Sequence, residues 1–321
     1  MNPTKSPNLL LALATVPFAG LALAVPAARA ETNAAQAAQA AQADMVKTVG
    51  FVPSFAKAFP AEGLPGIWQE VKDFELNKKT ALDGKTKDLI GLAIAAQMPS
   101  RLTAWSYSKC AKANGATETE LQEAVMMSAL SRHWSTFFNG MQLDEAKFRA
   151  DLNKLRENVT KAMASGAKPP APLAITDANS VYKDVQQSFG FVPEFMKRFP
   201  PEALPGAWIA MRDVEMNPTT AIPGKVKDLI SLAVSAQIPC RYCVIADTEF
   251  AKLDGATDRE IAEAVTAGGM VRQYITLVEG MQVDEKAYRR DWERLTAGSG
   301  QKKAAAAPAA AAKTTRVAKA D

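Results

Sequence analysis

The chain has 321 residues, of which 38 are lysine or arginine and 34 are aspartate or glutamate, and its formal net charge is +4. The basic surplus lies at the two ends, because residues 302–321 contribute +4 and residues 1–30 contribute +2. The body between them therefore carries about −2, which excludes the basic surface that nucleic-acid binding requires. The length suits two domains of ordinary size.

Residues 1–30 are predicted to be a secretory signal peptide. Lys5 precedes an apolar run from Leu9 to Val25, and Ala28-Arg29-Ala30 matches the small-residue pattern of a cleavage site. We expect the mature chain to enter an oxidising compartment, the periplasm, with no membrane attachment after cleavage. A retained membrane anchor is the alternative.

The body of the chain is an internal repeat without gaps, at an offset of 140 residues. Residues 50–155 and 190–295 are identical at 49 of 106 aligned positions. We expect a first repeat (31–160), a proline-containing linker (161–173), a second repeat (174–300) and a Lys/Ala-rich tail (301–321) that is disordered.

The apolar periodicity of each repeat is helical, and no segment alternates as a strand would. In the second repeat, residues 229–236 predict a helix buried on most sides, and a second helix runs from about Pro239 to Leu253. Thr257 and Glu260 have the spacing of a capping box, which predicts a helix from there to about Leu277. The sequence therefore predicts an all-α fold of two helical bundles. The bundles should pack as a pseudo-twofold pair, since each would otherwise expose its apolar helix.

Cys240 and Cys243 form a C-x-x-C pair that only the second repeat carries. The first repeat has Ser100 and Thr103 at the matching positions. Pro239 is suited to the first turn of a helix, which places the pair among unpaired N–H groups that favour a thiolate. Two thiols one turn apart and reachable from solvent suit thiol–disulfide exchange or peroxide reduction.

Two other interpretations of the pair stay open. A structural disulfide would close a loop of only four residues and would stabilise the fold by about 2 kcal/mol. Zinc would need two further ligands, and the one histidine, His133, lies in the other repeat. We therefore expect no metal and no cofactor, and we expect the third cysteine, Cys110, to be a buried, unreactive thiol.

Four neighbours of the pair are candidate site residues. Arg241 adds positive charge beside the thiols, and Tyr242 is expected to line the mouth of their pocket. Asp228, twelve residues before the pair, could accept a thiol proton, although Asp88 holds the same place in the first repeat and a helix N-terminus favours both carboxylates. Asp247, four residues after the pair, could accept a proton or raise the thiol pKa by repulsion.

The run Lys227-Asp228-Leu229-Ile230, the small apolar helix and the C-x-x-C pair resemble the carboxymuconolactone decarboxylase and alkylhydroperoxidase D-like superfamily. The tandem repeat is similar to that of alkylhydroperoxidase D. The resemblance implies an all-helical fold assembled as trimers or hexamers, with a redox branch that reduces hydroperoxides through its cysteine pair.

That redox branch has a glutamate at the position of Asp228 and a histidine at the position of Asp247. An ordinary aspartate stays ionised at the pH where histidine shuttles protons, so the second departure implies a less efficient peroxidase. The first repeat, which has neither cysteine, is expected to be catalytically silent.

The sequence thus predicts an exported thiol oxidoreductase that reduces hydroperoxides or disulfides, with Cys240, Cys243, Asp228 and Asp247 as its catalytic residues. Its partners would be a small peroxide or disulfide and a thiol reductant, and the chain would form a homo-oligomer such as a trimer. One alternative is a non-catalytic binding or scaffold protein. Another is a lyase that acts on a small carboxylated ring.

Overall fold

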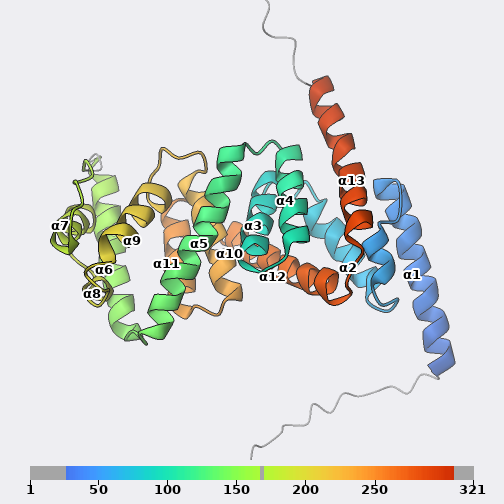
Figure 1. The fold of residues 1–321 in the computed structure, drawn as a ribbon, viewed down its shortest axis with the longest axis horizontal. Helices are drawn as coiled ribbons and strands as arrows, with labels where there is room; N and C mark the ends of the chain where they lie inside the picture. The colour runs from blue at the N-terminus through green and yellow to red at the C-terminus, as the bar shows by residue number, and fades with distance from the viewer. Residues whose placement is uncertain (1–26, 167–169, 307–321) are drawn as a thin grey trace, which may run out of the picture.

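The computed structural model describes residues 27–166 and 170–306, and the regular elements of these residues are all helices (Figure 1). The all-α prediction is confirmed. In chain order the elements are α1 (Ala27–Val49), η1 (Ser54–Ala58), α2 (Leu64–Glu70), η2 (Val71–Glu75), α3 (Gly84–Gln97), α4 (Arg101–Ala113), α5 (Glu118–Gly140), α6 (Glu145–Ala164), α7 (Ala178–Phe189), α8 (Glu194–Lys197), α9 (Leu204–Ala210), η3 (Met211–Glu215), α10 (Gly224–Gln237), α11 (Arg241–Leu253), α12 (Asp258–Gly280) and α13 (Glu285–Ala306).

The two halves contain the same elements at the same spacing, because α2 to α5 begin and end 140 residues before α9 to α12. Local sequence sets some of these ends. Thr117 and Thr257 each accept the N–H of the glutamate three residues later at 3.1 Å and complete a capping box. The capping box predicted at Thr257 is confirmed, and α12 continues past Leu277 to Gly280.

α3 and α10 lie at the centre of the molecule. α3 packs against α4, α5 and α12, whereas α10 packs against α11, α12 and α5. One apolar core therefore contains residues of both halves, such as Ile90 and Ile230, which are fully buried. Burying such side chains against each other contributes about 2 kcal/mol each to folding.

Hydrogen bonds between the halves are reciprocal. The carboxylate of Glu263 accepts the N–H groups of Ala81 and Leu82 at 2.9 and 2.8 Å. Glu123, its counterpart 140 residues earlier, accepts those of residues 221 and 222 at 2.8 and 2.7 Å. A twofold relation between the halves would produce such pairs, and the pseudo-twofold arrangement stays a prediction.

The last helix of each half lies against the other half. α6 packs on α11, and α13 packs on α4 and η1. Figure 1 shows α13 beside α1 and α2. Tyr288 of α13 forms a hydrogen bond of 2.9 Å with Ser106 of α4. Residues of one half therefore help to enclose the interior of the other.

Two expected boundaries fall inside helices. α6 reaches Ala164, beyond the expected end of the first repeat at residue 160. α13 reaches Ala306 and so enters the segment from residue 301 that was expected to be disordered. Most of the expected signal peptide (1–26) and the rest of the tail (307–321) lie outside the described residues. Of the helices in residues 27–166 and 170–306, none combines the length and the hydropathy needed to cross a membrane.

Candidate functional site

Cys240 and Cys243 are joined in a disulfide at the start of α11. The helix begins at Arg241, so Cys240 is its N-cap and Pro239 lies before the helix rather than in its first turn. The two Cα atoms are 5.3 Å apart, and the Cys243 N–H donates to the Cys240 sulfur at 3.2 Å. The Cys240 N–H donates to the Ser235 carbonyl at 3.3 Å. The sulfur of Cys240 therefore takes the place of the oxygen that usually caps a helix.

The disulfide is enclosed by aromatic side chains. Cys240 is 0% exposed and Cys243 is 5% exposed. Both pack in an apolar cluster with Phe138 and Phe148, which lie on α5 and α6 of the first half. The prediction that the pair is reachable from solvent is therefore wrong for the disulfide form, because helices from the other half cover it.

Tyr242 forms part of this cover, whereas Arg241 does not. The Tyr242 ring centroid is 5.4 Å from that of Phe148, and its hydroxyl donates to the Leu143 carbonyl at 2.6 Å. The Arg241 side chain is 73% exposed and lies 2.9 Å from a carboxylate oxygen of Glu145. Its charge is thus paired at the surface, which argues against the expected role of Arg241 in the thiol pocket.

The two candidate aspartates are held in their neutral form. Asp247 is buried and accepts a hydrogen bond of 2.8 Å from Ser235, whose carbonyl in turn binds the N-cap cysteine. Burial, and then the nearby Glu215, raise the pKa of Asp247 well above its ordinary value. Burial also raises the pKa of Asp228 to about 9, and Asp254, Glu215 and Asp247 add to the effect. The expectation that Asp247 is ionised is therefore wrong, because the packing around α11 removes it from water.

Hydroxyl groups replace the sulfurs in the first half. Ser100 is the N-cap of α4, and its Oγ lies 2.8 Å from the hydroxyl of Thr103. Ser100 also donates to a carboxylate oxygen of Glu279 at 2.6 Å. This turn therefore keeps the geometry of the cysteine turn without its redox chemistry.

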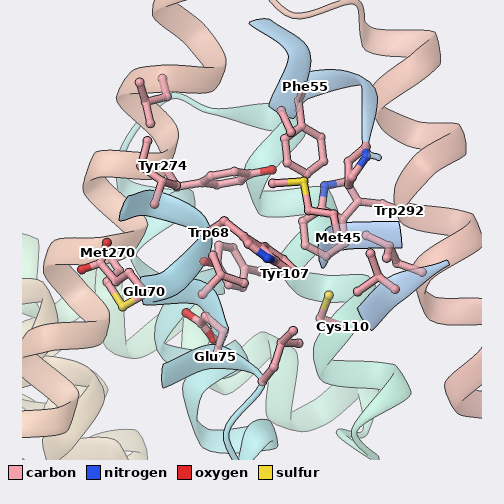
Figure 2. Close-up of a pocket in the computed structure, with 18 of the residues that line it drawn as sticks. Met45, Phe55, Trp68, Glu70, Glu75, Tyr107, Cys110, Met270, Tyr274 and Trp292 are labelled. Atoms are coloured by element: carbon pink, nitrogen blue, oxygen red, sulfur yellow. The ribbon is translucent and has the colours of Figure 1, made fainter. Parts of the chain in front are cut away.

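A cavity of about 370 Å³ lies in the first half, the half without the cysteine pair (Figure 2). Residues of α1, η1, α2, η2, α3 and α4 line it together with residues of α12 and α13 from the second half. This volume is within the range of small-molecule sites. Sequence reasoning treated this half as silent because it considered only the missing cysteines.

Three ionisable side chains of the cavity have raised pKa values. Burial raises the pKa of Asp88 to about 7, although Asn114 donates to its carboxylate at 2.7 Å. Burial also raises the pKa of Glu75, at the end of η2, and raises that of the Tyr107 hydroxyl well above its ordinary value. Glu75 and Asp88 both affect Tyr107, so the three groups lie near one another. A largely apolar pocket with a few convergent, perturbed polar groups is a common form of functional site.

Side-chain size explains why the cavity lies in this half. Three lining residues are matched by phenylalanine in the second half: Val49 by Phe189, Cys110 by Phe250 and Leu277 by Phe137. All three phenylalanines belong to or pack on the cluster around the disulfide. This pattern of small residues opposite phenylalanine was the sequence signal for the cavity. Burial raises the pKa of the Cys110 thiol well above its ordinary value, which agrees with the prediction of an unreactive thiol.

Comparison with known proteins identifies the family. Residues 202–286, which include the cysteine pair, match the model of the carboxymuconolactone decarboxylase family. A crystal structure from Burkholderia xenovorans LB400, of a protein provisionally named a gamma-carboxymuconolactone decarboxylase subunit, is 15% identical with a TM-score of 0.47. That alignment covers 84% of this chain and 97% of the other, and its similarity is too low to inform the function. No curated protein matches the chain. Through its second half, the chain belongs to the carboxymuconolactone decarboxylase-like superfamily.

Proposed function

We propose that the protein is a thiol oxidoreductase of the alkylhydroperoxidase type, with Cys240 and Cys243 as its redox centre. The observation that carries the proposal is the disulfide between neighbouring cysteines at the N-terminus of α11. A helix N-terminus favours the thiolate form that redox chemistry needs. The same half also supplies two protonated carboxyl groups, Asp228 and Asp247.

Cys243 is the better candidate for the attacking residue, because it is the less buried of the two. Its thiolate would attack a hydroperoxide oxygen, break the O–O bond and become a sulfenic acid, while the alkoxide released takes up a proton and leaves as an alcohol. The Cys240 thiolate would then attack the sulfenic sulfur, form the disulfide and release hydroxide, which a second proton converts to water. An external dithiol would supply the two electrons that return the disulfide to two thiols.

The neutral state of the two aspartates gives them a role that ionised aspartates could not have. A protonated carboxyl group does not repel a thiolate, and it can donate a proton to a leaving oxygen. Asp247 is connected to the cysteine turn through Ser235. We assign Asp247 the proton donation that a histidine provides in the redox branch of the superfamily, and Asp228 the return of that proton.

Substrate access requires movement of the aromatic cover over the sulfurs. Tyr242 and Phe250 are only partly buried, and both pack against the cluster that contains the disulfide. Displacement of these two side chains would expose Cys243 to a small hydroperoxide or disulfide. Export to the periplasm and assembly into a homo-oligomer are further parts of this proposal.

The test is hydroperoxide consumption with dithiothreitol as the reductant. Cys240→Ser and Cys243→Ser should each lose the activity, whereas Ser100→Ala, at the matching turn of the first half, should keep it. Alkylation and mass measurement before and after peroxide should show the loss of two free thiols in the wild type. Equal rates for the wild type and both cysteine variants would refute the proposal.

The burial of Cys240 favours a second function, a binding or scaffold protein whose disulfide is structural. The thiol pKa of the reduced protein separates the two functions, and the pH dependence of iodoacetamide alkylation measures it. Two pKa values near ~8.5 and no reaction with peroxide would support the scaffold. A depressed pKa on one cysteine would support the oxidoreductase.

A further inference from the structure

We propose that the cavity of the first half is a second ligand site, and that it binds a small ring compound carrying a protonated amine. This site is independent of the cysteine pair, so the amine site and the redox function can be tested separately.

Aromatic rings from five elements surround the cavity (Figure 2). They are Phe55 of η1, Phe59 after it, Trp68 of α2, Tyr107 of α4, Tyr274 of α12 and Trp292 of α13. The Phe55 ring centroid lies 5.7 Å from that of Tyr274 and 6.1 Å from that of Trp292. The Trp68 indole N–H donates to Asp44 at 2.8 Å, which fixes its orientation. Ring faces held in place around a small volume attract organic cations.

The charge of the cavity has one sign. The charged residues that line it are Glu70, Glu75 and Asp88, and no lysine, arginine or histidine is among its described lining residues. The ammonium of Lys87, a neighbour of Asp88 in sequence, donates to the Phe74 carbonyl at 2.6 Å and to other backbone oxygens. An anionic ligand would meet carboxyl groups without a counter-charge, whereas a cation would pair with them. The cavity therefore disfavours the carboxylated ring expected of a lyase of this superfamily.

The carboxyl groups lack a cationic partner inside the cavity. Burial is the main cause of the raised pKa of Asp88, and Glu75 and Asp83 raise it further while Asn114 and Lys87 lower it. Burial likewise raises the pKa of Glu75, with Glu70 adding to the effect and Lys87 opposing it. A bound ammonium group would stabilise the ionised form of both acids. A neutral ligand would gain nothing from their ionisation.

The cavity has the size and the opening that such a ligand needs. A volume of about 370 Å³ accommodates a ring with a short side chain. Leu76, which is 47% exposed, and Gln273, which is also exposed, both line the cavity. The cavity therefore reaches the surface between η2 and α12.

The test uses three probes of nearly equal shape: 2-phenylethylamine, 2-phenylethanol and 3-phenylpropionate. Calorimetric titration of the purified chain at pH 8 should show the amine binding at least tenfold more tightly than the alcohol or the acid. The amine should raise the melting temperature in proportion to its occupancy. Because Asp88 titrates near pH 7, amine binding should weaken about tenfold from pH 8 to pH 6. Tyr107 and Cys110 stay neutral over this range because burial raises both pKa values.

Variants locate the site. Asp88→Asn should weaken amine binding at least tenfold at pH 8, whereas Asp73→Asn, which removes the same charge from an exposed position of η2, should leave it unchanged. Cys110→Phe places in the cavity the side chain that the second half has at this position, and it should abolish amine binding. Circular dichroism and melting temperature verify that each variant is folded, and the pH profile of the wild type decides the matter if Asp88→Asn is not.

Three results would overturn the proposal. The first is the absence of heat and of thermal stabilisation with 2-phenylethylamine up to about 10 mM. The second is equal or tighter binding of the alcohol or the carboxylate. The third is amine binding that a folded Cys110→Phe variant retains, because the ligand would then lie elsewhere.

Discussion

Replacing Asp228 by asparagine should stabilise the protein, and the gain should grow with pH. Burial raises the pKa of this carboxyl group from the ordinary value of 3.8 to about 9. An acid whose pKa is raised by folding keeps its proton in the native state and releases it on unfolding. The native state therefore loses stability as the pH rises from the unfolded pKa to the native pKa. Asparagine is a neutral isostere of the protonated acid and avoids this loss.

The slope of the effect follows from the two pKa values of Asp228. Between pH 5 and pH 7, both within the interval from 3.8 to about 9, the wild type should lose up to ~1.4 kcal/mol per pH unit through this group. The difference in the free energy of unfolding between Asp228→Asn and the wild type should therefore grow by up to about 2.7 kcal/mol over this range. Asp228 keeps partial contact with solvent, so this value is an upper bound.

Urea unfolding followed by circular dichroism at pH 5, 6, 7 and 8 measures this difference. Asp88→Asn, at the matching position of the first half, is the paired variant, because the pKa of Asp88 is about 7. Its gain should stop growing near pH 7, whereas that of Asp228→Asn should continue to grow to pH 8. A gain from Asp228→Asn that is independent of pH would refute the assignment of a protonated native carboxyl group.

Three further changes test the packing. Replacing Cys240 and Cys243 by serine and threonine, the residues of the first half, should lower the free energy of unfolding by only about 2 kcal/mol in urea titration, and an unfolded product would contradict this. Phe250→Cys, again the residue of the first half, should increase the rate at which dithiothreitol reduces the disulfide, measured by alkylation and mass shift. An unchanged rate would show that Phe250 is not part of the cover. Glu263→Ala and Glu123→Ala should each cost about 2 kcal/mol in urea titration, because each leaves two backbone N–H groups unpaired, and a clear difference between them would show that the two contacts are not equivalent.

Local signals in the sequence predicted the helices well. The Thr257 capping box acts within one turn, so it determines the start of α12 wherever the helix packs. The π-helical turns η2 and η3, which end at Glu75 and Glu215, had no such signal. π-Turns of this kind depend on packing and often occur near functional sites.

The state of the candidate site depended on contacts that are distant in sequence. The spacing of Cys240 and Cys243 predicts that they can pair, but their burial arises from helices about 100 residues earlier in the chain. The raised pKa of Asp247 has the same origin, since it comes mainly from burial rather than from its neighbours on α11. The cavity could be found only from differences between the repeats, such as Cys110 opposite Phe250.

One scaffold holds two different interiors because a few matching positions differ in size. The aromatic rings around the disulfide fill the space that the cavity occupies in the first half, so one half could not contain both a sealed disulfide and a ligand cavity. Neither half could form its site alone, however. Tyr274 and Trp292, from the second half, line the cavity, while Phe138 and Phe148, from the first half, cover the disulfide. The exchange of α6 and α13 between the halves thus makes each interior depend on the whole chain, so a mutation that loosens one site should also affect the helix that completes the other.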